Sequence, residues 1–450
     1  MKKSKLLLGT IAGLSLFNVT AQELSIDAMI RPRFEYRHGF QDPARKDQEP
    51  AAFVSQRSSL ITKYTDTKIT ALIDFQDVSV WGDRPQLSGN DDAINQGGFG
   101  VNRAWAKVGL GNGFAVKAGR QFLSYDDQRI FGTLGWQQQQ RTHDAALLKY
   151  TKGNLKLDVG FAFNQTNDGG NNAGTTFEAR GPGSGLFQYK AMQFLHLSSQ
   201  LKEGWKGSFL FINNAFQNQL LTDGVFTDIT PGTQQRQTSG FYTDYSKGQF
   251  GLAGSAYYQF GKFGPNNLSA YQASIFGSYK PSKGSLKLVG LGAEILSGND
   301  NGTPSDGDNN AFFPLFGTNH KFNGFQDFFY VGRFANNVGL IDVSAKAVLK
   351  TGEKSKLIGF LHYFNAAADM PSDGDKYLGT AVDLVYVQGI NKYANIKIGY
   401  SQSFLSDDFL ALKKGPSTPI ASGQEAEVQN WGWVMLTINP NLFKWKKPTE

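Results

Sequence analysis

The feature that most constrains this chain is a series of short segments in which apolar and polar side chains alternate. In residues 25–37 the charged side chains fall on one face and the apolar ones on the other. The segments 154–164, 338–350 and 395–404 alternate in the same way. A period of two places successive side chains on opposite faces of a β-strand. Strands of about ten residues with one apolar and one charged face are typical of an outer-membrane β-barrel, whose apolar face meets lipid.

The first 21 residues have the composition of a secretory signal peptide. Lys2, Lys3 and Lys5 precede an apolar run from Leu6 to Phe17, and Val19-Thr-Ala21 gives a small-residue cleavage site. The apolar run is shorter than the ~20 residues that a spanning helix needs. We therefore predict that residues 1–21 are removed and that residues 22–450 form one barrel domain.

Composition excludes several classes of protein for this chain. The chain has no cysteine, which excludes a disulfide framework and a cysteine-ligated metal site. Glycine is abundant at 52 residues, aromatic residues make up 13%, and long helical periodicity is absent, so an all-β fold is favoured. Three of the positive charges behind the formal net charge of +7 lie in the leader. The remaining excess is too small to indicate a nucleic-acid partner.

The spacing of short turns and long loops predicts eighteen antiparallel strands. The predicted short turns are 64–66, 111–113, 152–153, 202–204, 246–248, 281–284, 351–354 and 388–391. The predicted long loops are 39–51, 82–99, 123–140, 166–187, 218–236, 262–267, 298–337, 367–375 and 405–427. A strand-like run at 325–333 is assigned to a loop, because counting it would break the alternation and give an odd strand number. The last strand is expected at Asn430–Phe443, followed by a lysine-rich tail.

Charged residues on a lipid face cost ~2–4 kcal/mol for Arg or Lys at the bilayer midplane, so the arginines are expected to face the lumen. A two-residue turn at Asn112-Gly113 would place Arg120 across from Trp105 on the inner face and leave Lys117 outside. A symmetric turn at 64–67 would place Arg57 opposite Asp74. The predicted pore-lining and substrate-binding residues are Arg31, Arg33, Arg37, Arg57, Arg103, Trp105, Arg120, Arg129 and Arg141. A ladder of salt bridges would also explain any single arginine, but their excess over nearby acids indicates an anionic ligand.

Two stretches carry a resemblance to a known family. Residues 119–145 read GRQ-x3-Y-x3-RxFG-x3-W-x4-RTxDA, and residues 315–329 read LFGTNHKFNGFQDFF. Both resemble the alginate-export family of outer-membrane β-barrels, in the form found in Bacteroidetes. The resemblance implies passive passage of an anionic polysaccharide, with Arg120, Arg129 and Arg141 acting in the channel.

Other motifs are weaker. The five histidines form no metal-binding or catalytic pattern, so no metal site, cofactor or enzyme activity is predicted. Three aspartates in 298–310 could ligate Ca²⁺, but the spacing is not that of an EF-hand. The Gln137–Gln140 tract is expected at a loop tip, with contact to sugar hydroxyls as the alternative. Most of the seven tryptophans are expected in the interfacial aromatic girdle, with Trp105 as the inward exception. The aromatic-rich 298–337 loop is expected to fold onto or into the barrel mouth.

The sequence thus predicts an 18-stranded outer-membrane channel of a Gram-negative bacterium, with an arginine-lined lumen for an anionic polysaccharide or oligosaccharide. The first alternative is an anion-preferring porin for small solutes, and the second is an adhesive or structural barrel. The expected partners are the anionic substrate, outer-membrane lipid, the barrel-assembly machinery and periplasmic export proteins, but no nucleic acid.

Overall fold

The computed structural model describes residues 22–83, 98–164, 189–222, 225–329, 337–413, 425 and 428–447. Residues 1–21 lie outside the described residues, so the signal peptide stays a prediction. In the described part of the chain no helix is long and apolar enough to cross a membrane.

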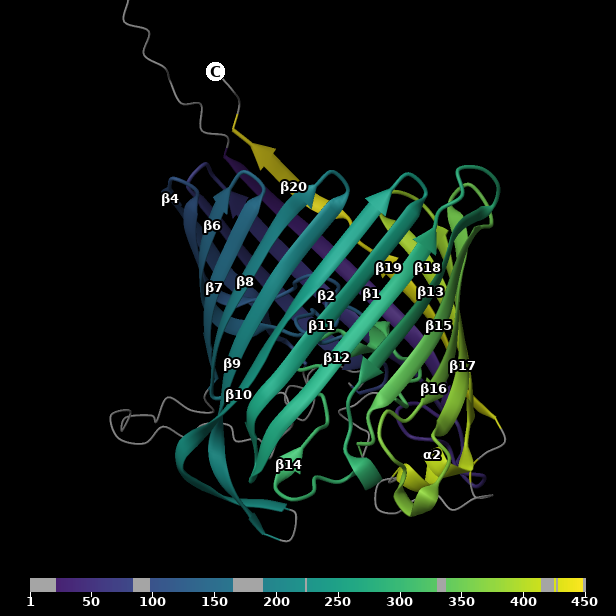
Figure 1. Cartoon of the computed structure of the whole chain (residues 1–450). Helices are drawn as coiled ribbons and strands as arrows, with labels where there is room; N and C mark the ends of the chain where they lie inside the picture. The colour runs from purple at the N-terminus through teal and green to yellow at the C-terminus, as the bar shows by residue number, and fades with distance from the viewer. Residues whose placement is uncertain are drawn as a thin grey trace, which may run out of the picture.

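Eighteen antiparallel strands form a closed barrel (Figure 1), as the sequence predicts. Closure is visible at β1, where Arg33 pairs with Ser55 of the second strand on one side and with Met435 of the last wall strand on the other. The wall strands are β1 (Glu23–His38), β2 (Ala51–Thr65), β3 (Ile69–Val80), β4 (Gly100–Gly111), β5 (Phe114–Gln121), β6 (His143–Lys152), β7 (Leu155–Phe163), β8 (Ala191–Lys202), β9 (Trp205–Thr222), β10 (Val225–Lys247), β11 (Phe250–Phe263), β12 (Asn266–Tyr279), β13 (Leu286–Leu296), β15 (Leu340–Lys350), β16 (Ser355–Asn365), β17 (Tyr377–Gly389), β18 (Ala394–Leu405) and β19 (Gln429–Ile438).

Two further strands lie outside the regular wall. β14 (Asp308–Asn309) pairs in parallel with the start of β12. β20 (Asn441–Lys446) follows a break at Asn439-Pro440 and continues along β1, beyond the rim of the barrel (Figure 1). The predicted closing strand Asn430–Phe443 is therefore split in two. Lys444 and Lys446 of the tail both form ion pairs with Glu23, which ties the tail to the barrel.

The short turns lie at one end of the barrel and the long loops at the other (Figure 1). Three predicted boundaries are wrong. The predicted 262–267 loop is a two-residue turn, because β11 continues to Phe263 and β12 begins at Asn266. The first turn spans 66–68, because Thr65 pairs with Thr70, and this register places Arg57 opposite Val78 instead of Asp74. The predicted 218–236 loop is also wrong, since β9 and β10 continue as one long hairpin to Thr222 and Val225.

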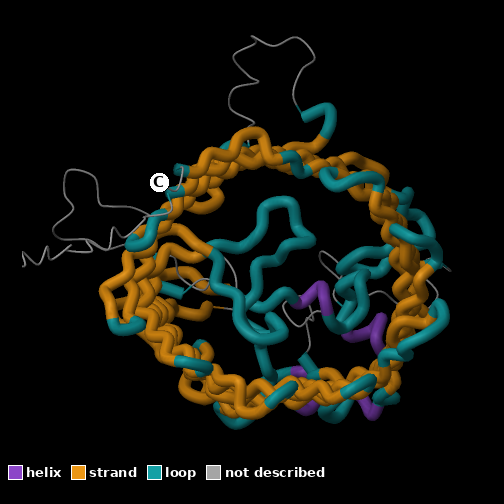
Figure 2. The backbone as a smooth tube through the Cα atoms, turned by 90° about the horizontal axis from the view of Figure 1, so that it is seen from above, coloured by secondary structure: helices purple, strands orange, loops and turns teal. Residues whose placement is uncertain are grey.

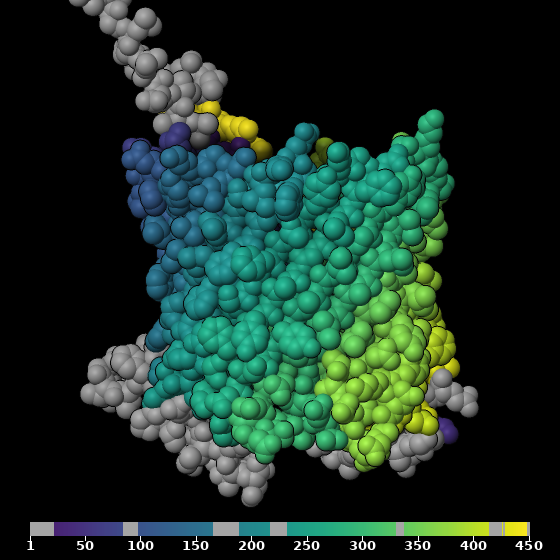
Figure 3. Space-filling model, in the orientation of Figure 1, coloured from purple at the N-terminus to yellow at the C-terminus, as the bar shows by residue number. Residues whose placement is uncertain are grey.

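The outer face of the wall is apolar, as a lipid-facing surface requires. On β1, for example, Ile30, Phe34 and Tyr36 are exposed, whereas the odd-numbered arginines are turned inward. The exterior forms a continuous wall of packed strands from β6 to β17 on the face seen in Figure 3. The tryptophans divide differently from the prediction. Trp81, Trp205 and Trp445 are exposed, but Trp431 and Trp433 are buried inside the barrel, and Trp136 is partly buried against them.

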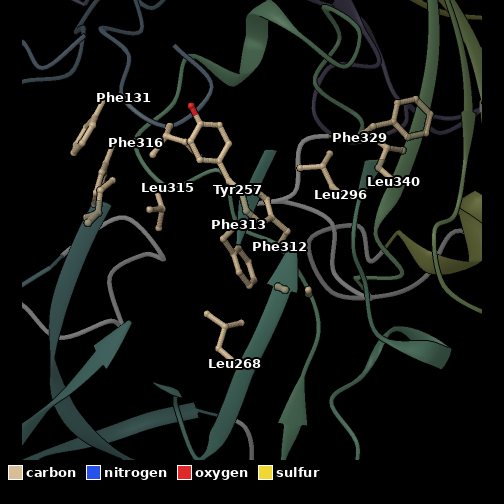
Figure 4. Close-up of a cluster of buried hydrophobic side chains, with 14 of the residues drawn as sticks. Phe131, Tyr257, Leu268, Leu296, Phe312, Phe313, Leu315, Phe316, Phe329 and Leu340 are labelled. Carbon is tan, nitrogen blue, oxygen red and sulfur yellow. The ribbon is translucent and has the colours of Figure 1, made fainter. Parts of the chain in front are cut away.

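Long loops fold into the barrel and give it a hydrophobic core. Figure 2 shows loop segments inside the ring of strands. Two loops supply buried side chains to the core: the 122–142 loop between β5 and β6, and the described part of the 297–339 loop between β13 and β15. The described part of the second loop contains the short helices η3 (Asp300–Gly302) and η4 (Asn319–Lys321), and 325–329 contains no strand, as predicted. Figure 4 shows Phe312, Phe313, Leu315 and Phe316 of this loop gathered with Tyr257 of β11.

The core extends over much of the inner wall. Inward-facing side chains of β8 and β9 are apolar where the loops cover them, for example Met192, Phe194 and Ile212. Two more helices lie at the loop end of the barrel, η6 (Pro371–Asp373) and α2 (Asp407–Leu412). Ser406 caps α2 through its side chain, and Phe409 packs against Phe329 at a ring distance of 4.7 Å. The loop end of the lumen is therefore packed like a protein interior.

Candidate functional site

The candidate site is the part of the lumen where the two inward loops meet. The Gly132 amide donates to the Phe316 carbonyl at 2.8 Å, and the Thr318 amide donates to the Gln128 carbonyl at 2.9 Å. The rings of Phe131 and Phe316 stack at 5.6 Å. The 122–142 loop and the 315–329 segment are also the two stretches that carry the family resemblance. Both stretches therefore build one structural unit, which fills part of the lumen.

Arginines of the barrel wall bind the 122–142 loop through its backbone. Arg31 donates to the carbonyls of Gly135, Trp136 and Gln137 at 2.7, 3.1 and 3.0 Å, and to the side-chain oxygen of Gln138. Arg57 donates to the Gln138 carbonyl at 3.3 Å, and Arg33 donates to the Trp136 carbonyl at 2.7 Å. We call Arg31, Arg33 and Arg57 the guanidinium anchor. Its function in this structure is to hold the loop.

The anchor changes the interpretation of the positive charge. Arg31 and Arg57 lie directly opposite each other across β1 and β2, an arrangement that is destabilising for like charges. Their partners are neutral carbonyl oxygens instead of an anion. The buried Gln138 completes the contact, since its side-chain nitrogen donates to the Arg31 carbonyl and to Ser55. The glutamine tract is therefore fixed to the wall through Gln138, whereas Gln137 and Gln139 are exposed.

Arg37 extends this row toward the loop end of the barrel. Glu35 is fully buried and forms ion pairs with Arg33 and Arg37, both at 2.8 Å. The Arg37 guanidinium also lies 4.0 Å above the ring of Phe40. A cavity of about 420 Å³ is bounded by these side chains and by Trp136. Arg37 keeps 29% of its side-chain surface exposed, more than Arg33.

On β4 and β5 the structure corrects the predicted faces. Gly111 and Phe114 flank the turn as expected, but the register shifts between Gly109 and Gly111, so Arg120 pairs with Ala104 instead of Trp105. Arg120 therefore points outward. Lys117 points inward, where its ammonium lies 4.0 Å above the ring of Trp105. One extra residue in a strand reverses every face beyond it.

The outward direction of Arg120 accounts for the outward direction of the acidic residue Asp144. Arg120 pairs with Asp144 at 2.9 Å, and both side chains are about half exposed. Both residues lie within two positions of the loop ends of β5 and β6, where the cost of a charge on the barrel exterior falls to ~0–1 kcal/mol. The motif-based prediction that Arg120 lines the pore is wrong.

We expect Arg120→Ala to leave ion selectivity and conductance unchanged, because the side chain does not reach the lumen. The lost pair is solvent-exposed and contributes less than ~1 kcal/mol to stability. Planar-bilayer recording of the variant in a salt gradient checks this result. A shift in reversal potential would show that Arg120 does act on the permeating ion.

The side chains of Arg103, Arg129 and Arg141 also have bonding partners within the protein. Arg103 pairs with Asp74 at 2.9 Å and lies over the ring of Phe122. Arg129 forms a buried ion pair with Glu294, and its guanidinium lies 3.5 Å from the ring centre of Phe322. Arg141 donates to the Gly317 carbonyl at 3.1 Å. The predicted arginines thus mostly connect the inward loops to the wall and to each other.

The predicted pore-lining cations are all arginines, but the inner wall also carries lysines. Ten lysines lie on inward strand faces within five residues of a short turn. We call them the lumenal lysines: Lys63, Lys107, Lys117, Lys149, Lys156, Lys206, Lys346, Lys350, Lys356 and Lys397. Among these ten lysines, only Lys149 forms an ion pair within the described residues, and its partner is Asp158. Strand alternation marks Lys156, Lys346, Lys350 and Lys397 as polar-face residues, so a signal for them was present.

Two cavities lie beside the lumenal lysines. One of about 770 Å³ is bounded by Lys156, Lys206 and Tyr242, below residues 124–126 of the loop. Here the Tyr125 hydroxyl donates to Asp158 at 2.8 Å, and burial raises the pKa of that hydroxyl. Tyr242 also borders a second cavity of about 250 Å³, which Lys346 and the loop residues Lys321 and Phe322 enclose. Each cavity is therefore lined both by residues of the wall strands and by residues of the inward loops.

No metal centre is formed by the described side chains, since they contain no group of three or more His, Cys, Asp or Glu placed to hold an ion. In the 298–310 segment Asp300 accepts from the Asp369 amide at 3.0 Å, and Asp308 accepts from Asn267 at 3.1 Å. Two of the three aspartates considered for Ca²⁺ thus accept hydrogen bonds from other parts of the chain.

Comparison with known proteins gives structural relatives only. No family model matches the sequence, and no curated protein matches it. OccAB4 of Acinetobacter baumannii superposes over 95% of this chain and 98% of its own, with a TM-score of 0.58 at 12% identity. OccK2 (OpdF) of Pseudomonas aeruginosa, solved in complex with glucuronate, covers 93% and 97%, with a TM-score of 0.57 at 11% identity. A BenF-like porin from Pseudomonas fluorescens Pf-5 covers 93% and 99%, with a TM-score of 0.59 at 11% identity.

At this level of identity the likeness establishes the fold. The fold and the apolar exterior are those of an 18-stranded outer-membrane β-barrel, as found in the outer membrane of Gram-negative bacteria. The resemblance to the alginate-export family gains no support from these comparisons.

Proposed function

We propose that this protein is a passive outer-membrane channel that prefers small anionic solutes, carboxylates among them. The observation that carries the proposal is the lumenal lysines. Among the described residues, inward faces within the same distance of the turns carry the acids Asp27, Asp158 and Asp244, together with Glu23 at the rim, which is already paired with Lys444 and Lys446. Fixed charge of one sign in a narrow aqueous space concentrates ions of the opposite sign. No catalytic step forms part of the proposal.

The distribution of acids strengthens this argument. The carboxylates deeper in the barrel are buried and bonded: Glu35 to two arginines, Glu294 to Arg129, and Asp74 to Arg103. Nine of the ten lysines have no ion-pair partner among the described residues. Positive charge therefore stays available to a solute at the turn end of the lumen. The structural relatives are consistent with this class, since one is described as a porin and another was solved with the carboxylate glucuronate.

An alginate-like polysaccharide is the second candidate, favoured by the motif resemblance. The packed loops argue against it. A long polymer needs a continuous wide path, whereas aromatic side chains such as Phe131, Phe316 and Phe329 fill the loop end of this lumen. We therefore place the small-solute channel first. Periplasmic export proteins and the barrel-assembly machinery stay predicted partners.

Reversal potential in a planar bilayer under a KCl gradient tests the proposal. We expect anion preference in the unmodified protein. Replacing Lys346, Lys356 and Lys397 by glutamine should lower the Cl⁻/K⁺ permeability ratio by about two- to threefold, because it removes unpaired lumenal charge. The matched control replaces Lys283, Lys354 and Lys392, which lie in the short turns outside the lumen.

Equal shifts in the two triple variants, or a cation-selective parent channel, would contradict the proposal. Alginate oligomers and glucuronate added to one side separate the two candidates. Current block by alginate alone would favour the polysaccharide, and the absence of any conductance would favour an adhesive or structural barrel.

A further inference from the structure

A group of buried carboxylates on the inner wall binds both inward loops. Glu294 of β13 and Asp342 of β15 lie directly opposite each other, and Asp383 of β17 lies nearby. The side-chain nitrogen of Asn323, in the 297–339 loop, donates to Glu294 at 2.9 Å and to Asp342 at 3.1 Å. The Phe325 amide of the same loop donates to Asp383 at 3.2 Å. Arg129 of the 122–142 loop pairs with Glu294. We call Glu294, Asp342 and Asp383 the carboxylate cluster.

One histidine lies between two of these acids. His362 of β16 is 4% exposed, and its Nδ1 lies 2.9 Å from Asp342. Its Nε2 faces Asp383 at 4.0 Å. Neither His362 Nε2 nor Asp383 Oδ1 has a hydrogen-bond partner in the described residues. The rings of Phe360 and Phe364 lie on either side of the imidazole, at 6.1 and 5.4 Å. The imidazole is therefore held between carboxylates and shielded by aromatic rings.

The charge balance of this region depends on the His362 proton. Three carboxylates in the cluster face one buried guanidinium, Arg129. With a proton on both nitrogens, His362 donates to Asp342 and presents a positive charge to Asp383. Without it, a lone pair on Nε2 faces the Asp383 carboxylate, and three negative charges share one arginine. Like charges in a buried site repel strongly, and buried charges without partners are costly.

We propose that His362 is a proton switch that sets how firmly the carboxylate cluster holds the two inward loops. While His362 carries its second proton, two cations balance most of the charge of the three carboxylates, and the loops stay bonded to the wall. As the pH rises through the titration of His362, repulsion within the cluster weakens the contacts of Asn323 and Phe325. Strong acid also releases the loops, because protonated carboxyls no longer balance Arg129. The loops are thus held best between these two limits.

Other charged groups lie near the carboxylate cluster. Lys346 of β15 and Lys321 of the loop border the adjoining cavity, as does Asp127 of the 122–142 loop. His320 pairs with Asp327 at 3.0 Å within the 297–339 loop, on the side facing Trp136. Of these histidines only His362 lies on the wall and contacts the cluster that receives both loops.

Single-channel conductance measured from pH 5.5 to pH 9 tests the switch. The unmodified channel should conduct more at alkaline pH, with a single titration step. His362→Gln removes the proton and should give the alkaline conductance throughout this range. Asp383→Asn removes one acid beside the imidazole, and should move the step to lower pH. His38→Gln, which changes a histidine of β1 outside the cluster, should behave like the unmodified protein.

Hydrogen–deuterium exchange gives a readout that does not require an open channel. At pH 7 the amides of residues 318–329 should exchange about tenfold faster in His362→Gln than in the unmodified protein, because the Phe325 amide loses its acceptor geometry. A conductance step that persists in His362→Gln would overturn the proposal. So would unchanged exchange of this segment, or a flat pH profile in the unmodified channel. The anion preference proposed above is measured separately by reversal potential, so either idea can fail alone.

Discussion

Replacing Arg31 and Arg57 together by methionine should raise single-channel conductance by about twofold or more. Methionine keeps much of the side-chain volume but removes every donor that reaches the carbonyls of residues 135–138 from these two positions. Each hydrogen bond from a charged group contributes ~1.5–3 kcal/mol, and each buried carbonyl left without a donor costs ~1–3 kcal/mol. The 122–142 loop should therefore lose its fixed position against β1 and β2. Recording in planar bilayers at symmetric salt measures the change.

The effects of the two single variants on conductance should not be additive. Arg31 makes most of the contacts, whereas Arg57 contributes one hydrogen bond to the Gln138 carbonyl and lies directly opposite Arg31. Arg57→Met alone removes repulsion between neighbouring guanidinium groups as well as one bond, so its effect should be small. Arg37→Met is the matched control, because Arg37 contacts Glu35, Phe40 and Phe53 and no residue of the 122–142 loop. Unchanged conductance in the double variant would show that the loop is held without the guanidinium anchor.

The barrel itself was predictable because its causes are local. Alternation fixes which face of a strand meets lipid, and turns such as Asn112-Gly113 are set by a few residues. The inward direction of Arg31, Arg33 and Arg37 follows from that rule alone. The register of β4 against β5 did not follow, because a shift near Leu110 has no sequence signature. That single irregularity reversed Arg120 and Lys117 and moved a motif arginine out of the lumen.

The candidate site was harder to predict because it depends on backbone partners. The sequence shows an excess of arginine, but it cannot show that the compensating groups are carbonyls, since every residue carries one. Arg31 is stabilised by Gly135, Trp136 and Gln137, about a hundred positions away. The two motif stretches marked the right segments for another reason: they form the loops that fill the barrel. Aromatic residues such as Phe312 and Phe316 gave the signal that the 298–337 loop folds inward.

Replacing Glu35 by alanine should destabilise the barrel by ~3–5 kcal/mol, the range measured when one partner of a buried ion pair is removed. Glu35 is fully buried where β1 meets β19, and it accepts from Arg33, from Arg37 and from the Trp431 indole at 3.1 Å. Its loss leaves two guanidinium groups without a counter-charge at the seam that closes the barrel. Urea unfolding of the protein in lipid vesicles, followed by tryptophan fluorescence, measures the change.

Two further variants separate charge from packing in that prediction. Combining Glu35→Ala with Arg33→Met should recover part of the lost stability, because replacing both partners of a buried pair by apolar groups costs less than removing one. Glu23→Ala is the matched control at the rim, where Glu23 binds Lys444 and Lys446 in a mostly exposed setting. Because these two ion pairs are exposed to solvent, their loss should leave the unfolding midpoint almost unchanged. Equal losses at Glu35 and Glu23 would mean that burial does not determine the cost, and that the seam is held by its strand pairing instead of by this carboxylate.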